Sequence, residues 1–174
     1  MRHVRLVALL LASALYASAA SATTLLKVGE RFPTWTLLDH TGTPVSSSTL
    51  RGQTYLLWFY PKAMTPGCTA EGDGLRDKYG EFRKAGITVF GVSFDKPKDN
   101  AKFVEKESFP FALLSDTKRR LALRVGAADS PQQTTARRIS YLIGGDGKVL
   151  RVYAAVTPTM HAADVLRDLG AATP

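Results

Sequence analysis

The sequence predicts one α/β domain in which a central mixed β-sheet is flanked by helices, with a β-hairpin near its N-terminus. Two observations lead to this prediction. Two continuous apolar runs, TYLLWFY at 54–60 and ITVFGVS at 87–93, are typical of central strands covered on both faces. A segment of helix length separates them, and a strand, a helix and a strand in this order form a βαβ unit with parallel strands.

The elements on either side of these strands follow from local signals. The turn signal Asp39-His40-Thr41-Gly42 lies between apolar stretches at 32–38 and up to Val45, which indicates an opening hairpin. The helix after the first core strand runs from Pro66 to about Lys84, because Gly86 is a natural helix stop.

The second half of the chain continues the alternation. GGDG at 144–147 separates runs at 139–143 and 148–153 and predicts a hairpin turn, because a phosphate-binding glycine loop leads into a helix and this one leads into a strand. The order of all these elements is a thioredoxin-like layout. The other expected elements are helices over 97–107, 117–125 and 159–169 and a short strand over 111–114.

The first 22 residues have the features of a secretory signal peptide. Arg2 and Arg5 precede an apolar run, and Ala20-Ser21-Ala22 has the A-x-A pattern of a cleavage site. A retained membrane anchor is the alternative, but the apolar run is short for a span. We therefore expect cleavage before Thr23, no membrane attachment afterwards, an exported protein that is periplasmic or secreted, and a domain over 23–174.

Composition excludes several classes of protein. The 174 residues carry a formal charge of +8, and basic runs occur at 118–120 and 137–138. Short charge runs are usually solvated faces and an exported protein seldom meets nucleic acid, so no nucleic-acid partner is expected. No cluster has the spacing of metal ligands, so neither a metal nor another cofactor is expected. The chain has one cysteine, which excludes an internal disulfide.

That cysteine lies in the stretch TPGC at 65–68. A lone cysteine is usually a small buried hydrophobe. If a helix begins here, however, Thr65 is its N-cap, Pro66 its first residue, and Cys68 lies in its first turn. The sulfur then faces unpaired backbone N–H groups at the positive end of the helix dipole, an environment that stabilises a thiolate.

The helix alone is too weak an activator. A cysteine with an ordinary pKa of about 8.5 is a few per cent thiolate at pH 7, and lowering a pKa by about two to three units requires roughly 3 to 4 kcal/mol. A helix terminus supplies roughly 0.3 to 1 kcal/mol. A fixed cation is therefore needed beside the sulfur, and spacing alone does not say which arginine it is.

The stretch FYPKAMTPGCTAE at 59–71, with its PxxxTxxC core, resembles the active-site signature of the peroxiredoxins. The segments FYPK and TPGCTAE within this stretch resemble the corresponding segments of the Q-type, or bacterioferritin comigratory protein, branch. The resemblance covers nearly all of the chain after the signal segment, including LRG at 50–52 and RISYLI at 138–143. It implies a thiol peroxidase with a thioredoxin-like fold that reduces hydrogen peroxide and organic hydroperoxides in antioxidant defence.

The resemblance also implies roles for individual residues. Cys68 matches the peroxidatic cysteine, whose thiolate attacks the O–O bond and becomes a sulfenic acid. Thr65 matches the residue whose hydroxyl bonds the peroxide, and Pro61 the one that shields the sulfur. Arg138 matches the arginine beside sulfur and peroxide, and with Thr65, Cys68 and the backbone of Gly67 it would bind substrate.

The sequence departs from the family where many Q-type members carry a resolving cysteine, five residues after the first. Asp73 occupies that position, so the sulfenic acid must be reduced by an external thiol of thioredoxin-like, glutaredoxin-like or low-molecular-weight type. Gly72 and Gly74 weaken the helix there by about 1 kcal/mol each relative to alanine, which would make this turn mobile. A monomer and a homodimer both suit this branch.

Each of these residues also has a purely structural interpretation. In that interpretation Thr65 is only a helix cap, Pro61 only ends a strand and Arg138 is only a surface cation. Glu71 either orients an arginine or lies on a solvated helix face. A cysteine hydrolase would pair Cys68 with a histidine, and after the signal segment only His40 and His161 are available. A non-enzymatic exported protein, a binding or chaperone-type protein with an unreactive thiol, is the remaining class.

Overall fold

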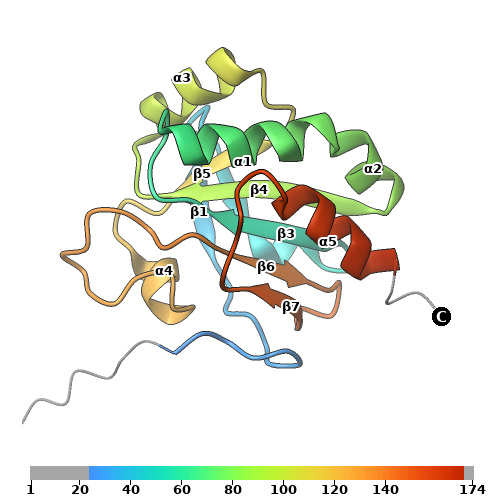
Figure 1. Cartoon of the computed structure of the whole chain (residues 1–174). Coiled ribbons are helices and arrows are strands. Elements are labelled where there is room, and N and C mark those ends of the chain that lie inside the picture. Colours follow the sequence, from blue (N-terminus) through green and yellow to red (C-terminus); the bar gives the residue numbers. More distant parts are fainter. Residues whose placement is uncertain (1–23, 171–174) are drawn as a thin grey trace, which may run out of the picture.

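A seven-stranded mixed sheet with the strand order β2-β1-β5-β4-β3-β6-β7 forms the centre of the protein (Figure 1). The computed structural model describes residues 24–170, so the predicted signal peptide lies outside the described residues. No helix within 24–170 is long and apolar enough to cross a membrane. The elements are β1 (Thr36–Asp39), β2 (Pro44–Ser46), the 3-10 helix η1 (Ser47–Leu50), β3 (Thr54–Phe59), α1 (Pro66–Asp77), α2 (Tyr79–Lys84), β4 (Ile87–Ser93), α3 (Pro97–Glu107), β5 (Ala112–Ser115), α4 (Arg120–Arg124), β6 (Ile139–Ile143), β7 (Val149–Tyr153) and α5 (His161–Gly170).

The sheet has the mixed pairing that the sequence predicts. Strands β3 and β4 are parallel neighbours joined through α1 and α2, as the βαβ interpretation requires. Both hairpins, β1–β2 and β6–β7, are antiparallel. The opening hairpin joins the sheet through β1, which pairs antiparallel with β5, a placement that the sequence did not predict.

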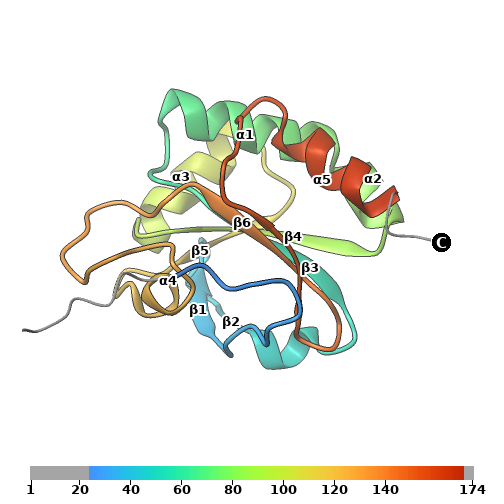
Figure 2. The same cartoon turned by 60° about the horizontal axis from the view of Figure 1, so that its bottom comes forward.

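Alternating side chains of β3 build two cores, one on each face of the sheet. Leu56, Trp58 and Tyr60 point into the core under α1, α2, α3 and α5. Tyr55 and Leu57 point into the other core, which the opening hairpin and α4 cover. Figure 2 shows the four helices on one side of the sheet and α4 on the other. Burial on both faces explains why β3 is an unbroken apolar run.

Three predicted helices differ in their bounds. The helix expected over 66–84 is divided at Lys78, whose ψ of 8° leaves the helical range, so that α1 and α2 are separate. The helix expected over 117–125 begins only at Arg120, because Arg119 has a left-handed φ of 55°. The side chain of Asp116, before this turn, accepts the backbone N–H of Ala122. The closing helix begins at His161 and not at residue 159.

A packing constraint explains one of the glycines of α1. A Cβ on Gly72 would lie 2.4 Å from Cζ of Phe109 and 3.1 Å from Cη2 of Trp58. The Phe109 ring has little room to yield, because it packs between two other phenylalanine rings. Gly72 is therefore required for the close approach of α1 to the core, within the helix that the sequence predicts.

We expect Gly72→Ala to lower the free energy of unfolding by about 2 kcal/mol, since the added methyl group overpacks a filled core. Gly74→Ala is the matched control. Its Cβ would lie 3.8 Å from Cβ of Ala162, an ordinary contact, so this variant should be neutral or more stable by up to about 1 kcal/mol. Urea denaturation of both variants measures the difference, and equal stabilities would contradict the packing explanation.

Candidate active site

The loop from β3 to α1 places the cysteine in the first turn of α1, beyond the carboxyl end of the central strand β3. Thr65 has the extended backbone of an N-cap, Pro66 is the first helical residue, and Cys68 lies in the first turn with its side chain buried, as the sequence predicts. The Thr65 side chain makes no capping hydrogen bond, and its hydroxyl donates to the carbonyl of Lys62 at 2.9 Å. The Thr65 oxygen thus keeps its lone pairs free to accept a further hydrogen bond.

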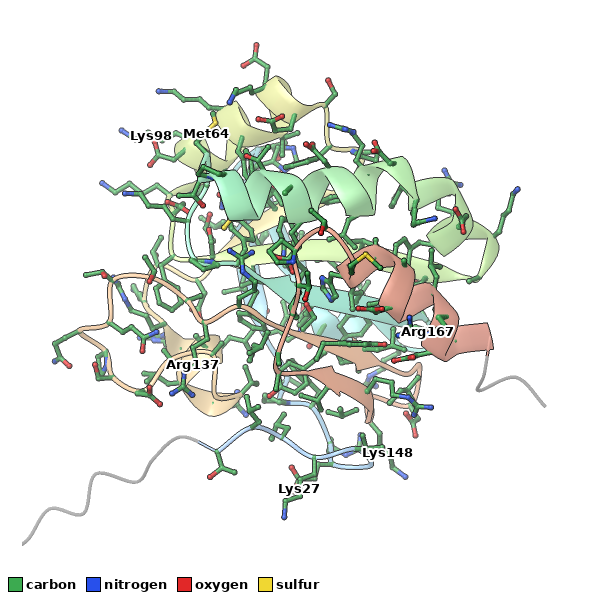
Figure 3. All side chains as sticks on the ribbon, in the orientation of Figure 1. Lys27, Met64, Lys98, Arg137, Lys148 and Arg167 are labelled. Atoms are coloured by element: carbon green, nitrogen blue, oxygen red, sulfur yellow. The ribbon has the colours of Figure 1, made fainter. Side chains whose placement is uncertain are left out.

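The end of β4 holds this loop in place. Asp95 Oδ2 accepts the backbone N–H of Ala63 at 2.9 Å and the hydroxyl of Ser93 at 2.9 Å. Met64, which lies at the start of α1 in Figure 3, has a left-handed φ of 63° and turns the chain into the helix. Asp95 was not identified from the sequence as a residue of the site. Its position just after β4 was the available signal, because the carboxyl ends of the parallel strands β3 and β4 meet at the same edge of the sheet.

Arg138 lies against the sulfur, as the resemblance implies. Its Nη2 is 3.5 Å from Cys68 Sγ, and its Nη1 is 3.4 Å from the carbonyl oxygen of Gly67. The sheet explains this meeting of residues far apart in sequence. Strand β6 runs antiparallel to β3 and its first residue, Ile139, pairs with Phe59, so the residue before β6 lies next to the loop that leaves β3.

The guanidinium group is a permanent cation at this site. Burial alone would lower the pKa of Arg138, but the negative charges of Glu71 and Cys68 outweigh it and raise that pKa above its ordinary value. Gly67 leaves room for this group, because a Cβ there would lie 3.1 Å from Arg138 Nη2. The fixed cation that a reactive thiol requires is therefore present, and Arg138 is not a surface cation.

Glu71 is fully buried, so it orients an arginine and does not lie on a solvated helix face. Its Oε2 accepts a hydrogen bond from Arg138 Nη1, and its Oε1 lies 2.8 Å from Nδ1 of the buried His161. The hydrolase arrangement is not formed, because His161 contacts Glu71 and the group against the sulfur is Arg138. The other histidine, His40, accepts the backbone N–H of Leu113 instead.

The remaining predicted residue, Pro61, is half-buried at the start of the loop between β3 and α1. The preceding Tyr60 is buried beneath the site, and its hydroxyl donates to Asn100 at 2.7 Å. Burial raises the pKa of Tyr60 well above its usual value, so this residue stays neutral. Within residues 24–170, no three His, Cys, Asp or Glu side chains are arranged to hold a metal ion.

Asp73, at the position of the expected resolving cysteine, lies inside α1. It accepts a hydrogen bond at 2.7 Å from Nη1 of Arg76, which also donates at 2.7 Å to the carbonyl of Glu107 at the end of α3. These bonds connect the second half of α1 to the end of α3.

The arrangement combines a thiol with several hydrogen-bond donors. The first turn of α1 leaves the N–H groups of Gly67 and Cys68 without helical acceptors, and Arg138 adds a charged donor on the same side. Donors that converge in a partly buried place stabilise a thiolate and any negative charge that develops on an atom next to the sulfur. The site is thus suited to nucleophilic attack by sulfur with an anionic leaving atom.

Known proteins are similar to this chain in sequence and in fold. Residues 28–152 match the AhpC/TSA family. The chain is 40% identical over 149 residues to peroxiredoxin Bcp of Escherichia coli K12, and this alignment covers 83% of this chain and 96% of that protein. The crystal structure of peroxidoxin BcpB from Mycobacterium tuberculosis is 34% identical, with a TM-score of 0.79 over 86% of this chain and 99% of the other.

A further solved structure, that of a PrxQ variant from Xylella fastidiosa, is 28% identical and has a TM-score of 0.78 over 85% of this chain and 98% of the other. The similarity therefore spans the sheet, its helices and the site together. The thioredoxin-like fold that the sequence predicts is confirmed by these structures. The chain belongs to the AhpC/TSA family and is a one-cysteine peroxiredoxin, an oxidoreductase similar to the bacterial Bcp and PrxQ proteins.

Proposed function

We propose that Cys68 is the peroxidatic thiol of this enzyme and that it reduces hydrogen peroxide and organic hydroperoxides. The observation that carries the proposal is the contact between Arg138 Nη2 and Cys68 Sγ, 3.5 Å, at the N-terminus of α1. The thiolate attacks the terminal oxygen of the hydroperoxide, an S–O bond forms and the O–O bond breaks. The cysteine becomes a sulfenic acid, and the leaving oxygen takes a proton and departs as water or an alcohol.

The neighbouring groups have complementary parts in this step. The Thr65 hydroxyl, which already donates to Lys62, accepts a hydrogen bond from the O–H of the substrate. Arg138 and the N–H groups of Gly67 and Cys68 stabilise the charge that moves onto the leaving oxygen. Pro61, at the start of the loop, shields the sulfur from bulk water. These donors stabilise the transition state, and a free thiolate in water has no such fixed donors.

An external thiol completes the cycle in this proposal. Its sulfur attacks the sulfenic acid of Cys68 to give a mixed disulfide and water, and a second thiol releases the reduced cysteine with a disulfide as the other product. Cys68 is buried, so the reductant reaches it only when the segments that cover the first turn of α1 move apart. The reductant belongs to the thioredoxin-like, glutaredoxin-like or low-molecular-weight class, and the enzyme works as a monomer or a homodimer.

Peroxide consumption in the presence of dithiothreitol tests the proposal. The reduced wild-type protein should consume hydrogen peroxide and cumene hydroperoxide catalytically, and Cys68→Ser should lose all protein-dependent consumption, since no other thiol is present. Circular dichroism of Cys68→Ser serves as the control for folding. A wild-type rate equal to that of dithiothreitol alone would instead favour the exported binding or chaperone-type protein with an unreactive thiol.

We also propose that the protein is exported and acts in the periplasm, or is secreted. Support comes from the basic, apolar and A-x-A pattern of residues 1–22 and from the family match, which begins only at residue 28. The N-terminal sequence of the protein recovered from a periplasmic extract tests this. A mature N-terminus at Thr23 is expected, and recovery of the full chain from the cytoplasm would contradict it.

A further inference from the structure

His161 and Glu71 form a buried polar pair behind the active site. Glu71 has no exposed surface and His161 has 1%, so neither side chain reaches water. Glu71 Oε2 accepts a hydrogen bond from Arg138, and Oε1 lies 2.8 Å from His161 Nδ1. A buried carboxylate is costly unless its oxygens have partners, so the position of Glu71 depends on both neighbours.

The short distance between Nδ1 and Oε1 indicates where the histidine proton lies. The ring N–H is not aimed straight at Oε1, so the contact lacks the geometry of a formed hydrogen bond. Two lone pairs 2.8 Å apart would nevertheless repel each other, and a proton on Nδ1 removes this repulsion. Nε2 of His161 has no hydrogen-bond partner among residues 24–170 and is buried, which leaves Nδ1 as the nitrogen with an acceptor nearby.

The closing helix fixes the histidine in turn. His161 is the first residue of α5, its backbone N–H bonds the carbonyl of Thr157, and its ring packs edge-on against Tyr153 at 5.6 Å between centroids. Helix α5 also packs against α1, where Ala162 faces Gly74. The histidine therefore has little freedom to move, and it contacts the carboxylate oxygen of Glu71 that the guanidinium group does not.

We propose that His161 is a positioning residue for peroxide reduction, which holds Glu71 so that Glu71 orients Arg138 against Cys68. This inference rests on the proposed function of Cys68. The chain of contacts runs from α5 through His161 and Glu71 to Arg138, whose other nitrogen, Nη2, is 3.5 Å from the sulfur. Loss of the histidine removes the polar group that lies 2.8 Å from Oε1, so the carboxylate shifts and the guanidinium group loses its alignment. Small misplacements of such groups reduce rates substantially.

The experiment compares His161→Leu with His161→Asn in stopped-flow oxidation of the reduced protein by hydrogen peroxide. Asparagine places an amide N–H near the position of Nδ1, whereas leucine keeps bulk without a donor. We expect the second-order rate constant to fall about 10-fold in His161→Leu and to return to within about 3-fold of wild type in His161→Asn. Thermal unfolding of each variant shows whether it is folded, and His161→Gln, whose amide lies one bond further out, replaces His161→Leu if that variant does not fold.

A second comparison tests whether His161 acts through Glu71. In a Glu71→Met background, His161→Leu should cause no further loss of rate, because methionine has no oxygen for the histidine to contact. An unchanged rate in His161→Leu, equal losses in His161→Leu and His161→Asn, or an undiminished effect in the Glu71→Met background would each overturn the positioning role. A wild-type protein that is oxidised no faster than free cysteine would instead refute the proposed function itself.

Discussion

Arg138→Ala is expected to slow the oxidation of Cys68 by hydrogen peroxide by about 10²- to 10³-fold. The guanidinium group is the only charged donor seen against the sulfur among residues 24–170, and removal of one such donor from a transition state has this order of effect. The measurement is the second-order rate constant of the reduced protein in stopped-flow fluorescence. Arg137→Ala is the matched control, because Arg137 pairs with the exposed Asp129, away from α1 (Figure 3), and should leave the rate unchanged.

Arg138→Ala also leaves the Glu71 carboxylate buried with one partner fewer, which by itself destabilises the fold. The double variant Arg138→Ala/Glu71→Gln removes that unpaired charge while the donor stays absent. Its rate should be as low as that of the single variant. A rate within about 3-fold of wild type in either folded variant would show that Arg138 does not assist the reaction.

Without an added thiol, the protein is expected to reduce one equivalent of hydrogen peroxide rapidly and then to stop. The chain has a single cysteine, and Asp73 stands where a resolving cysteine is expected, so no intrachain disulfide can regenerate Cys68. A second equivalent reacts only to over-oxidise the sulfenic acid to a sulfinic acid. Peroxide titration combined with intact-mass analysis measures both steps, and addition of dithiothreitol after the first equivalent should restore the thiol.

The control for this stoichiometry is the same titration on protein whose thiol has been blocked with iodoacetamide. The blocked protein should consume no peroxide in the rapid phase. Rapid consumption of several equivalents by the unblocked protein without any thiol would contradict a one-cysteine cycle. The oxidised product should also contain no intrachain cross-link.

The local part of the site could be predicted from the sequence because it depends on neighbours in the chain. Thr65, Pro66 and Cys68 occupy the cap, the first residue and the first turn of α1, as their residue types indicate. The core strands were equally clear, since β3 and β4 are largely buried on both faces and contain no charged residue.

The rest of the site depends on packing between distant elements. Glu71 and His161 are 90 positions apart, and only the packing of α5 against α1 brings them together. Likewise, α4 begins after Arg119 because Arg119 has a left-handed backbone conformation. An arginine side chain gives no indication of that conformation, so the start of α4 could not be predicted. Arg138 was identified through the family resemblance, whereas its position follows from the antiparallel register of β6 and β3.

The most direct test of the account is stopped-flow oxidation of the reduced protein, lacking residues 1–22, by hydrogen peroxide and by an organic hydroperoxide, followed by dimedone trapping and peptide mass analysis. We expect oxidation far faster than that of free cysteine, with one sulfenic acid per chain, at Cys68. Oxidation at the rate of a free thiol would contradict it and leave a peroxiredoxin fold without the activity.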